Sequence, residues 1–489
     1  MTISNNQIPK EVQKISSILK EANFESYIVG GCVRDIILNK KPKDWDITTN
    51  AIPEEIQKLF PNSFYENTYG TVGIKTESED PTLQVVEITP YRLDAEYSDK
   101  RHPGKVTFSK TLSEDLQRRD FTINALAMDI DKGQIIDEYK GQDDLSNRLI
   151  RAVGEPEKRF SEDALRMLRA IRFSAELGFV IEQATAESIS KNAKLMKFVS
   201  TERVGDEFRK IIMSDNPALG LGLAQKLGIL KYILPIFEES VGCEQNKEAH
   251  KYDVWEHCLR TLQHAADKKF SQEIRLAALF HDVSKPQTKA VIAGKTTFYN
   301  HEVVGARVTR ETLRKMAFPR ETIEKVTKLV RHHMFFSDTD QITHSAVRRL
   351  IAKVGKDEIW NLMNLRICDR IGSGRPKEEP YRLRKFQSMI EEVIRDPISV
   401  SMLKIDGNTI ISMFHMKPGP KIGYVLHALL EEVLDDPTKN NETFLVKRSA
   451  ELLELDDKEI KAIGEKGKET KKDRDEEKVQ EIRKKRFVK

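Results

Sequence analysis

The sequence is poor in cysteine and has no long apolar run. Four cysteines occur among 489 residues, at positions 32, 243, 258 and 368, and none of them forms a C-x-x-C pair. Such scatter argues against a disulfide framework and a structural zinc site, and it predicts reduced thiols in a cytoplasmic protein. No apolar run approaches the roughly 20 residues of a membrane span, so we expect no membrane attachment. The start MTISNNQIPKEVQK also lacks a signal-peptide core.

The sequence also has no large excess of positive or negative charge. Lys and Arg number 81 against 77 Asp and Glu, which leaves a net charge of +4. A nucleic-acid partner would therefore have to meet a local basic surface. The length predicts several domains, and 39% hydrophobic with 32% charged residues fits a helix-rich protein with charged outer faces.

Against these absences, residues 27–50, YIVGGCVRDIILNKKPKDWDITTN, carry a dense set of signals. The apolar run 27–29 predicts a buried strand that ends in Gly30 and Gly31, where a backbone without Cβ lets a ligand approach closely. A short helix follows, and its Arg34 could meet a phosphate at the same place. A Gly-Gly pair alone is more often only a turn.

Two carboxylates flank Trp45 in the next strand-like stretch. The i, i+2 spacing of Asp44 and Asp46 on a strand directs both to one face, where they could hold one or two Mg²⁺. Together with the glycines, this favours phosphoryl or nucleotidyl transfer. A solvated strand face is the alternative. Glu87, in LQVVEIT, is a weaker candidate for a third carboxylate.

Adjacent arginines follow a long polar stretch at 91–108, which reads as a functional loop. Arg118 and Arg119 precede an apolar strand expected from 121, and their planar forks suit a triphosphate. The alternative is a surface ion pair with Asp120 or Glu114, and the two interpretations are about even.

From Ser161, expected to be an N-cap, the pattern becomes helical. An i+3 series then runs along this helix, comprising Asp163, Arg166, Arg169 and Arg172. It forms a polar spiral that is costly unless something anionic lies against it. A carboxylate accepts an exocyclic amine proton and Arg donates to ring acceptors, so Asp163 and Arg166 could read a base edge. An i, i+3 salt bridge on a solvated helix is the alternative.

The middle of the chain contains histidines and acids at the ends of predicted helices. The main set is His257, His281, Asp282 and Asp369, with His301, His332 and His333 between its members. Imidazole and carboxylate together suit a divalent or transition metal. A single His-Asp pair would be chance, whereas this ordered set predicts a metal site of unspecified identity.

Taken together, five motifs resemble those of bacterial class II tRNA nucleotidyltransferases, the CCA-adding enzymes of the poly(A) polymerase family. They are GGCVRD with DWDITTNA, YRLDAEYSDKRHP, DLQRRDFTINALA, GQDDLSNRLIRAVG and SEDALRMLRAIRF. The resemblance implies an α+β fold in which a mixed-sheet, polymerase-β-like nucleotidyltransferase domain precedes helical domains. The expected domains are the catalytic domain 1–150, a helical neck 151–235, an HD phosphohydrolase-like domain 236–400, a tRNA-binding segment 401–455 and a charged tail 456–489.

The resemblance also implies roles for single residues. Asp44 and Asp46 match the catalytic carboxylates that hold Mg²⁺, and nucleotide-binding positions are matched by Gly30, Gly31, Arg34, Arg118, Arg119, Asp163, Arg166, Arg169 and Arg172. The substrates are then CTP, ATP and tRNA, recognised through the shape and backbone of its upper half. Four positions match the divalent-metal ligands of an HD domain: His257, His281, Asp282 and Asp369.

Other interpretations of the same residues stay open. CC-adding enzymes resemble this pattern but lack the flexible loop, so the full loop at 91–104 favours a complete CCA enzyme or an A-adding one. A bacterial poly(A) polymerase shares only the first motif. The chain could instead bind tRNA without transferring nucleotides, or the HD phosphohydrolase could be its main activity. The sequence leaves the oligomeric state and the role of the tail open.

Overall fold

The computed structural model describes residues 7–65, 70–93, 107–245, 251–292, 295–335 and 342–463. Two compact units make up the chain: Met1–Thr327 with Gly372–Gly374, and Lys328–Ile371 with Arg375–Lys489. In the described ranges, no helix is long and apolar enough to cross a membrane. All four cysteines are buried.

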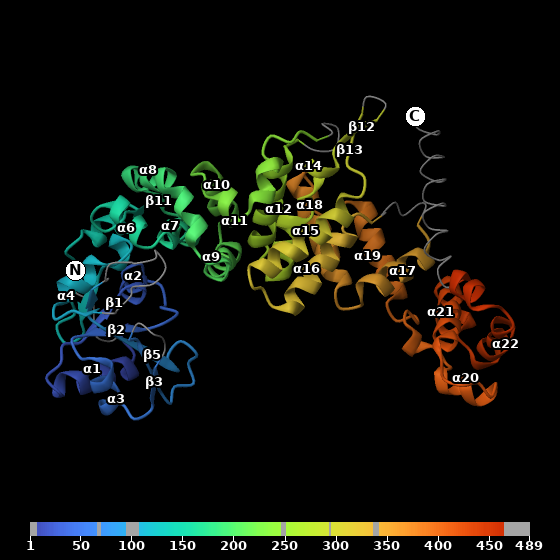
Figure 1. The fold of residues 1–489 in the computed structure, drawn as a ribbon, viewed down its shortest axis with the longest axis horizontal. Coiled ribbons are helices and arrows are strands. Elements are labelled where there is room, and N and C mark those ends of the chain that lie inside the picture. The colour runs from blue at the N-terminus through green and yellow to red at the C-terminus, as the bar shows by residue number, and fades with distance from the viewer. Residues whose placement is uncertain are drawn as a thin grey trace. The chain divides into compact units, whose positions relative to one another are not determined.

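The first unit begins with a seven-stranded mixed sheet (Figure 1). Its order is β3-β4-β5-β2-β1-β8-β9, and only the β2–β5 pair is parallel. The strands are β1 (Tyr27–Val29), β2 (Asp46–Thr49), β3 (Ser63–Tyr65), β4 (Val72–Lys75), β5 (Val85–Pro90), β8 (Ala127–Asp129) and β9 (Gln134–Ile136). This sheet confirms the expected α+β class and places the two predicted acidic strands side by side.

Short helices surround the sheet, namely α1 (Lys10–Glu21), α2 (Gly31–Ile37), α3 (Pro53–Leu59), α4 (Leu112–Gln117) and α5 (Gly141–Ser146). The strand expected from 121 is wrong, since Thr122–Asn124 form the 3₁₀ helix η2 and β8 begins at Ala127. Asp120 accepts hydrogen bonds from the Phe121 N–H and the Asn124 side chain, and such local bonds favour a turn over a strand. β6 (Arg92–Leu93) pairs with β7 (Thr107–Phe108), and the predicted loop between them, 94–106, lies outside the described residues.

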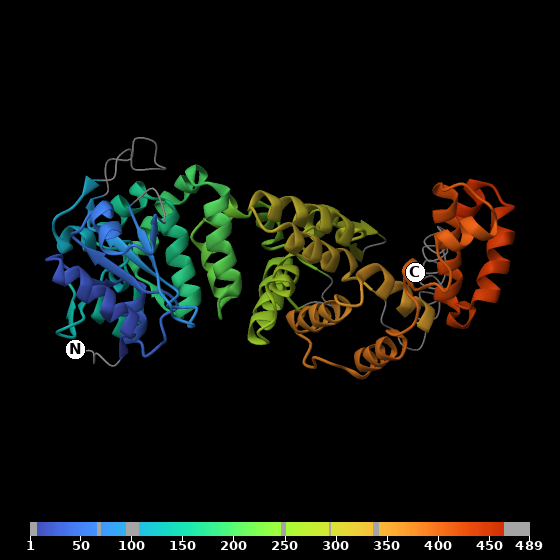
Figure 2. The same ribbon diagram turned by 90° about the horizontal axis from the view of Figure 1, so that it is seen from below.

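Helices of the expected neck follow and lie next to the sheet (Figure 2). They are α6 (Pro156–Glu162), α7 (Leu165–Leu177), α8 (Gln183–Asn192), η3 (Ala193–Phe198), α9 (Thr201–Met213), α10 (Pro217–Lys226), α11 (Leu230–Ile233) and η4 (Pro235–Ser240). Ser161 is not an N-cap but lies inside α6. The helix breaks at Asp163, whose Oδ1 accepts from the Leu165 N–H at 3.0 Å. A strand pair, β10 (Leu149–Ile150) with β11 (Val180–Ile181), adds to the neck helices.

The histidine-bearing region continues the first unit with α12 (Val254–Asp267), α13 (Gln272–Phe280), α14 (Lys285–Thr288), the hairpin β12 (Ala290–Ile292) and β13 (Lys295–Thr297), and α15 (His301–Lys315). Helix α16 (Arg320–His332) extends into the second unit. That unit then contains α17 (His344–Val354), α18 (Ile359–Gly372), α19 (Tyr381–Val393), η5 (Val400–Met402), α20 (Gly407–Met413), α21 (Pro420–Asp435), η6 (Pro437–Lys439) and α22 (Glu442–Leu453). The domain boundaries expected from the sequence stay predictions.

Candidate functional site

Gly30 forms the turn between β1 and α2 in a conformation that only glycine adopts easily. Its φ and ψ are 80° and −129°. A Cβ at this position would lie 3.1 Å from the Arg119 guanidinium and 3.9 Å from a carboxylate oxygen of Asp46. The turn therefore packs directly against one predicted phosphate ligand and one predicted metal ligand.

Three carboxylates gather at the same place. Asp46 opens β2, and the parallel register places it opposite Glu87 of β5. Asp44 stays exposed just before the strand and is close enough to act on Asp46 electrostatically. The register supports the weaker prediction that Glu87 joins the two aspartates.

The electrostatics of Asp46 fit a cation site. Burial, followed by the charges of Asp44 and Glu87, raises the pKa of Asp46 to about 7, and Arg119 only partly opposes this. Carboxylate oxygens are the ligands that Mg²⁺ prefers, and a cation would relieve the mutual repulsion. The donor set thus suits a divalent metal.

Arg118 and Arg119 are both held by Asp115, a buried residue of α4. Arg118 Nη2 lies 2.6 Å from Asp115 Oδ1, and Arg119 Nη2 lies 3.0 Å from Oδ2. The alternative interpretation, an ion pair with Asp120 or Glu114, is wrong about the partner, because both arginines pair with Asp115. Asp115 fixes both guanidiniums, and Arg119 is the one that lies beside Gly30 and acts electrostatically on Asp46.

Asp163 lies at the break between α6 and α7, and Arg166 lies in the first turn of α7. Asp163 Oδ2 accepts from Arg203 Nη2 of α9 at 2.7 Å. Arg166 donates to Glu162 Oε2 at 2.7 Å and to the Arg118 carbonyl at 3.0 Å. These contacts fix both predicted base-reading groups and tie Arg166 to the arginine pair of the catalytic domain.

Carboxylates of the chain itself lie against the rest of the spiral. Arg169 Nη2 pairs with Asp120 Oδ2 at 2.7 Å, and Arg172 Nε lies 2.8 Å from Glu207 Oε2. Burial alone would raise the pKa of Asp120, but Arg169 outweighs it and the pKa falls to about 2. The predicted anionic partner of the spiral therefore includes Asp120 and Glu207.

One aromatic ring joins the two halves of the site. Phe173 of α7 is buried, and the guanidiniums of Arg34, Arg169 and Arg172 lie 5.4, 5.5 and 4.2 Å from its ring centroid. Arg34 also donates to Asn124 Oδ1 at 2.8 Å. Cation–π contacts of this kind hold guanidiniums in place, so predicted nucleotide ligands of the sheet and of the neck converge here.

We expect Gly30→Ala to reduce nucleotide-dependent activity about tenfold or more, since each ~1.4 kcal/mol of lost transition-state stabilisation is tenfold in rate. The added Cβ displaces the Arg119 guanidinium. Gly154→Ala is the matched control, because Gly154 also has a positive φ, 66°, but has no atom within 4 Å of an added Cβ. Equal losses of kcat in both variants would contradict this explanation.

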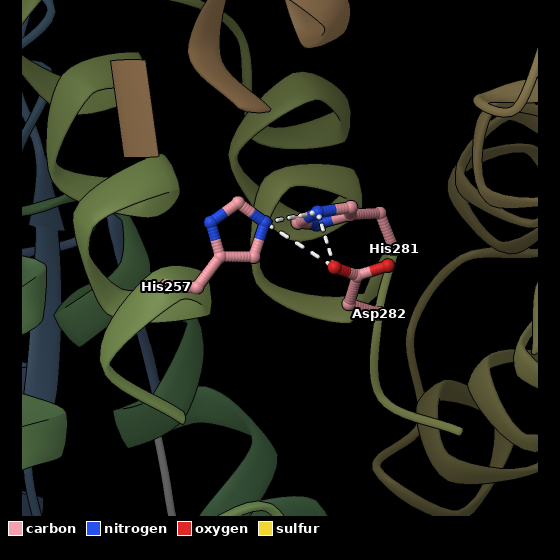
Figure 3. Close-up of side chains that lie close together, drawn as sticks. All are labelled: His257, His281 and Asp282. Carbon is pink, nitrogen blue, oxygen red and sulfur yellow. Dashed lines mark hydrogen bonds and ion pairs between the residues drawn. The ribbon is translucent and has the colours of Figure 1, made fainter. Parts of the chain in front are cut away.

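A second cluster lies in the histidine-bearing region (Figure 3). His257 of α12 and His281, which ends α13, approach each other with their Nε2 atoms 2.9 Å apart. Asp282 Oδ2 lies 3.2 Å from His257 Nε2 and 3.3 Å from His281 Nε2. All three residues are buried. Because the Ala278 carbonyl can only accept, His281 donates through Nδ1 and turns the lone pair of Nε2 toward the cluster, as a metal ligand requires.

Two further groups bind Asp282. Lys285 Nζ lies 2.6 Å from Asp282 Oδ2 and donates to Gln245 Oε1, also at 2.6 Å. His301 Nε2 lies 3.3 Å from Asp282 Oδ1. Burial would raise the pKa of Asp282, but His281 and Lys285 hold it well below its usual range. Asp282 is therefore a permanent anion surrounded by nitrogen groups.

The remaining predicted ligands of this region belong to the second unit. Asp369 lies on α18, where its Oδ2 accepts from Arg366 Nη1 at 2.6 Å. His332 ends α16, and the buried His333 bonds to the Val330 carbonyl at 2.7 Å. That Asp369 completes the metal set stays a prediction.

Sequence reasoning missed several residues that organise the site. Asp115 had a local signal, because it precedes Arg118 and Arg119 by three and four residues on a helical stretch. Glu207 had none, because its partner Arg172 comes from another helix. Phe173 shares α7 with Arg169 and Arg172, but the approach of Arg34 from α2 had no local signal.

Models of three protein families match the chain. A Poly A polymerase head domain matches residues 26–151, a probable RNA and SrmB-binding site of polymerase A matches 178–240, and an HD domain matches 254–371. The first match contains the carboxylates and Gly30, and the third contains the His-Asp cluster.

Several relatives of the chain are named CCA-adding enzymes. A CCA-adding enzyme of Lactobacillus helveticus (strain DPC 4571) is 50% identical over 194 residues, which span 40% of this chain and about half, 47%, of the relative. The CCA-adding enzyme of Ligilactobacillus salivarius (strain UCC118) is 31% identical over 91% of this chain and 98% of its own length. The crystal structure of the Bacillus stearothermophilus CCA-adding enzyme in complex with CTP is 26% identical, with a TM-score of 0.67 over 91% of this chain and 100% of that chain. The chain belongs to the family of CCA-adding enzymes.

Proposed function

We propose that this chain adds C, C and A to the 3′ end of tRNA from CTP and ATP without a nucleic-acid template. In each step the terminal 3′-hydroxyl oxygen attacks the α-phosphorus of the nucleotide. The bond from that phosphorus to the oxygen bridging toward the β-phosphate breaks, and pyrophosphate leaves with the electron pair. The hydroxyl proton is lost to solvent.

One observation carries the proposal. The acidic group of Asp44, Asp46 and Glu87, the Gly30 turn and the Arg119 guanidinium meet at one point of the sheet. Carboxylates for a metal beside an arginine for phosphate are what nucleotidyl transfer needs. The relative that aligns over 98% of its length is itself named a CCA-adding enzyme.

The residues divide the work by their positions. Mg²⁺ held by Asp44 and Asp46, when bound, would neutralise triphosphate charge and favour ionisation of the 3′-hydroxyl. Arg119, fixed by Asp115, orients the phosphates, and Gly30 leaves room for them. Asp163 accepts a hydrogen bond from the exocyclic amine shared by cytosine and adenine, and Arg166 donates one to a ring acceptor. Asp44 and Asp46 thus act at the triphosphate, and Asp163 with Arg166 acts at the base.

The direct test uses labelled CTP and ATP with Mg²⁺ and tRNA transcripts that end before CCA, after C and after CC. Ordered addition of C, C and A that then stops supports the proposal. Extension from the CC end alone would indicate an A-adding enzyme, and long A tails would indicate a poly(A) polymerase. No incorporation from any transcript would refute nucleotidyl transfer.

A second activity is favoured by the cluster of His257, His281 and Asp282. Two imidazole nitrogens and a carboxylate oxygen, all within 3.3 Å of one another, suit a divalent metal. With Lys285 beside them, they fit phosphohydrolase or cyclic phosphodiesterase activity on phosphate ends. A purely structural metal is the competing role.

For this cluster, we expect His281→Ala to lower the divalent metal bound per chain and to abolish hydrolysis of a cyclic nucleotide phosphodiester, because it removes one of three nitrogen and oxygen donors. Nucleotide incorporation into tRNA should stay within about twofold, as the two sites share no residue. His427→Ala, at an exposed histidine of α21, is the control. Loss of metal without any hydrolytic activity in the parent chain would point to a structural site.

A further inference from the structure

The catalytic domain contains a cavity that the proposed reaction does not use. Its volume is about 350 Å³, within the range of about 300–1,000 Å³ typical of small-molecule sites. The end of α2, the following turn, Trp45 and the residues before β5 line it. It therefore touches two elements that carry catalytic groups.

The lining divides into an apolar floor and a charged mouth. Ile36, Trp45 and Leu83 are buried and supply the apolar part. Lys40 and Lys41 are exposed beside it. An aromatic and aliphatic floor suits a flat ring, and the lysines suit an anion attached to that ring.

The mouth keeps a net positive charge. Lys41 Nζ pairs with Asp80 Oδ2 at 2.7 Å, and this bond lowers the pKa of Asp80 to about 2. Asp80 is thereby neutralised by Lys41, and Lys40 is the remaining lysine of the lining, with Asp215 of the neck also within its electrostatic reach. An anion can also compete with Asp80 for Lys41, because the Lys41 side chain is 71% exposed.

The cationic turn is fixed to α2. The Asn39 N–H bonds to the Ile36 carbonyl at 2.9 Å and the Lys40 N–H to the Asp35 carbonyl at 2.8 Å. Asn39 has a φ of 54°, so the helix ends in a left-handed residue, as capped helices commonly do. The lysines are therefore presented by a folded helix end and not by a loose loop.

Trp45 links the cavity to the catalytic carboxylates. Its carbonyl accepts from the Glu87 N–H at 3.0 Å, so it extends the β2–β5 ladder by one residue. Its indole lines the cavity, and the next residue, Asp46, is the first of β2 and one of the proposed metal ligands. An occupant of the cavity would contact the residue between the two aspartates.

We propose that this cavity is a second binding site, separate from the catalytic nucleotide site, for a nucleoside monophosphate. The base lies against Trp45 and Leu83, and the phosphate meets Lys40 and Lys41. The ring and the dianion together account for both parts of the lining, whereas a free phosphate would use only the mouth.

The test places a reporter at the cavity. The chain has three tryptophans, at 45, 255 and 360, so the full-length protein labelled with 5-fluorotryptophan gives three ¹⁹F signals, and Trp45→Phe assigns one of them. AMP and CMP are titrated in EDTA, with inorganic phosphate and tRNA as separate arms. A saturable shift of the Trp45 signal with AMP or CMP supports the proposal. No shift overturns it, as does an equal response to phosphate alone or a response to tRNA only.

Variants separate this cavity from the catalytic site. The double variant Lys40→Ala with Lys41→Ala should weaken AMP binding at least about tenfold, as expected for lost charged hydrogen bonds, and Lys58→Ala, at an exposed lysine of α3, should not. Asp163→Ala should leave the Trp45 shift intact. Unchanged affinity in the lysine variant, or loss of the shift in Asp163→Ala, would refute a separate site.

Discussion

We expect Asp46→Asn to lower nucleotide incorporation about 1,000-fold or more, a loss typical of removing a central electrostatic group from an active site. Asparagine keeps the shape but loses the charge that a cation needs. The same variant should unfold at no lower temperature than the parent, because Asp46 is half-buried beside two like charges, Asp44 and Glu87. Single-turnover incorporation and thermal unfolding measure the two effects.

Two further variants test the same prediction. Asp143→Asn removes an exposed carboxylate from α5 and should change neither quantity. Glu87→Gln should cost incorporation at least about tenfold if the register with Asp46 makes Glu87 part of the metal site. Full activity in Asp46→Asn would remove the acidic cluster from the mechanism, and full activity in Glu87→Gln would restrict the site to two aspartates.

Local patterns predicted the parts of the site that lie close together in the chain. The strand at 27–29 and the Gly30 turn form as expected, because strand patterning and glycine geometry act within a few residues. The His281-Asp282 pair likewise comes to His257. The second strand begins only at Asp46, so the expectation that Asp44 shares a strand face with it is wrong. Sequence spacing alone was enough to predict those site residues that a single helix or strand supplies.

Sequence patterns could not predict which residues from distant elements contact the site. The i+3 series was expected to face an anion, and the sequence could not say that Asp120 and Glu207 of the chain supply it. The predicted Ser161 N-cap is wrong because α6 runs through Ser161 and α7 begins only at Leu165, whose N–H donates to Asp163 Oδ1. Similarly, nothing in the spacing reveals that three arginines share the ring of Phe173.

The second large effect concerns the choice of nucleotide. We expect Asp163→Ala to reduce the preference for CTP over UTP in kcat/KM by about 100-fold or more, because a site built to bond a polar group strongly rejects an analogue that lacks it. Asp163 already bonds to the Leu165 N–H and to Arg203, at 3.0 and 2.7 Å. Each carboxylate oxygen has a second lone pair, so one remains for the exocyclic amine.

Arg203 tests whether the position of the Asp163 carboxylate matters, since Arg203 acts through its ion pair with Asp163. Arg203→Ala should reduce the same preference by a smaller factor, about tenfold, and Arg203→Lys should recover part of it, because lysine keeps the charge but loses the planar fork. Glu157→Ala is the control. Glu157 lies on the neighbouring α6 and forms an exposed pair with Lys191, so its loss should leave the CTP preference unchanged. A CTP preference that survives Asp163→Ala would show that another group reads the base, and a loss of total incorporation at unchanged preference would make Asp163 a structural cap of α7.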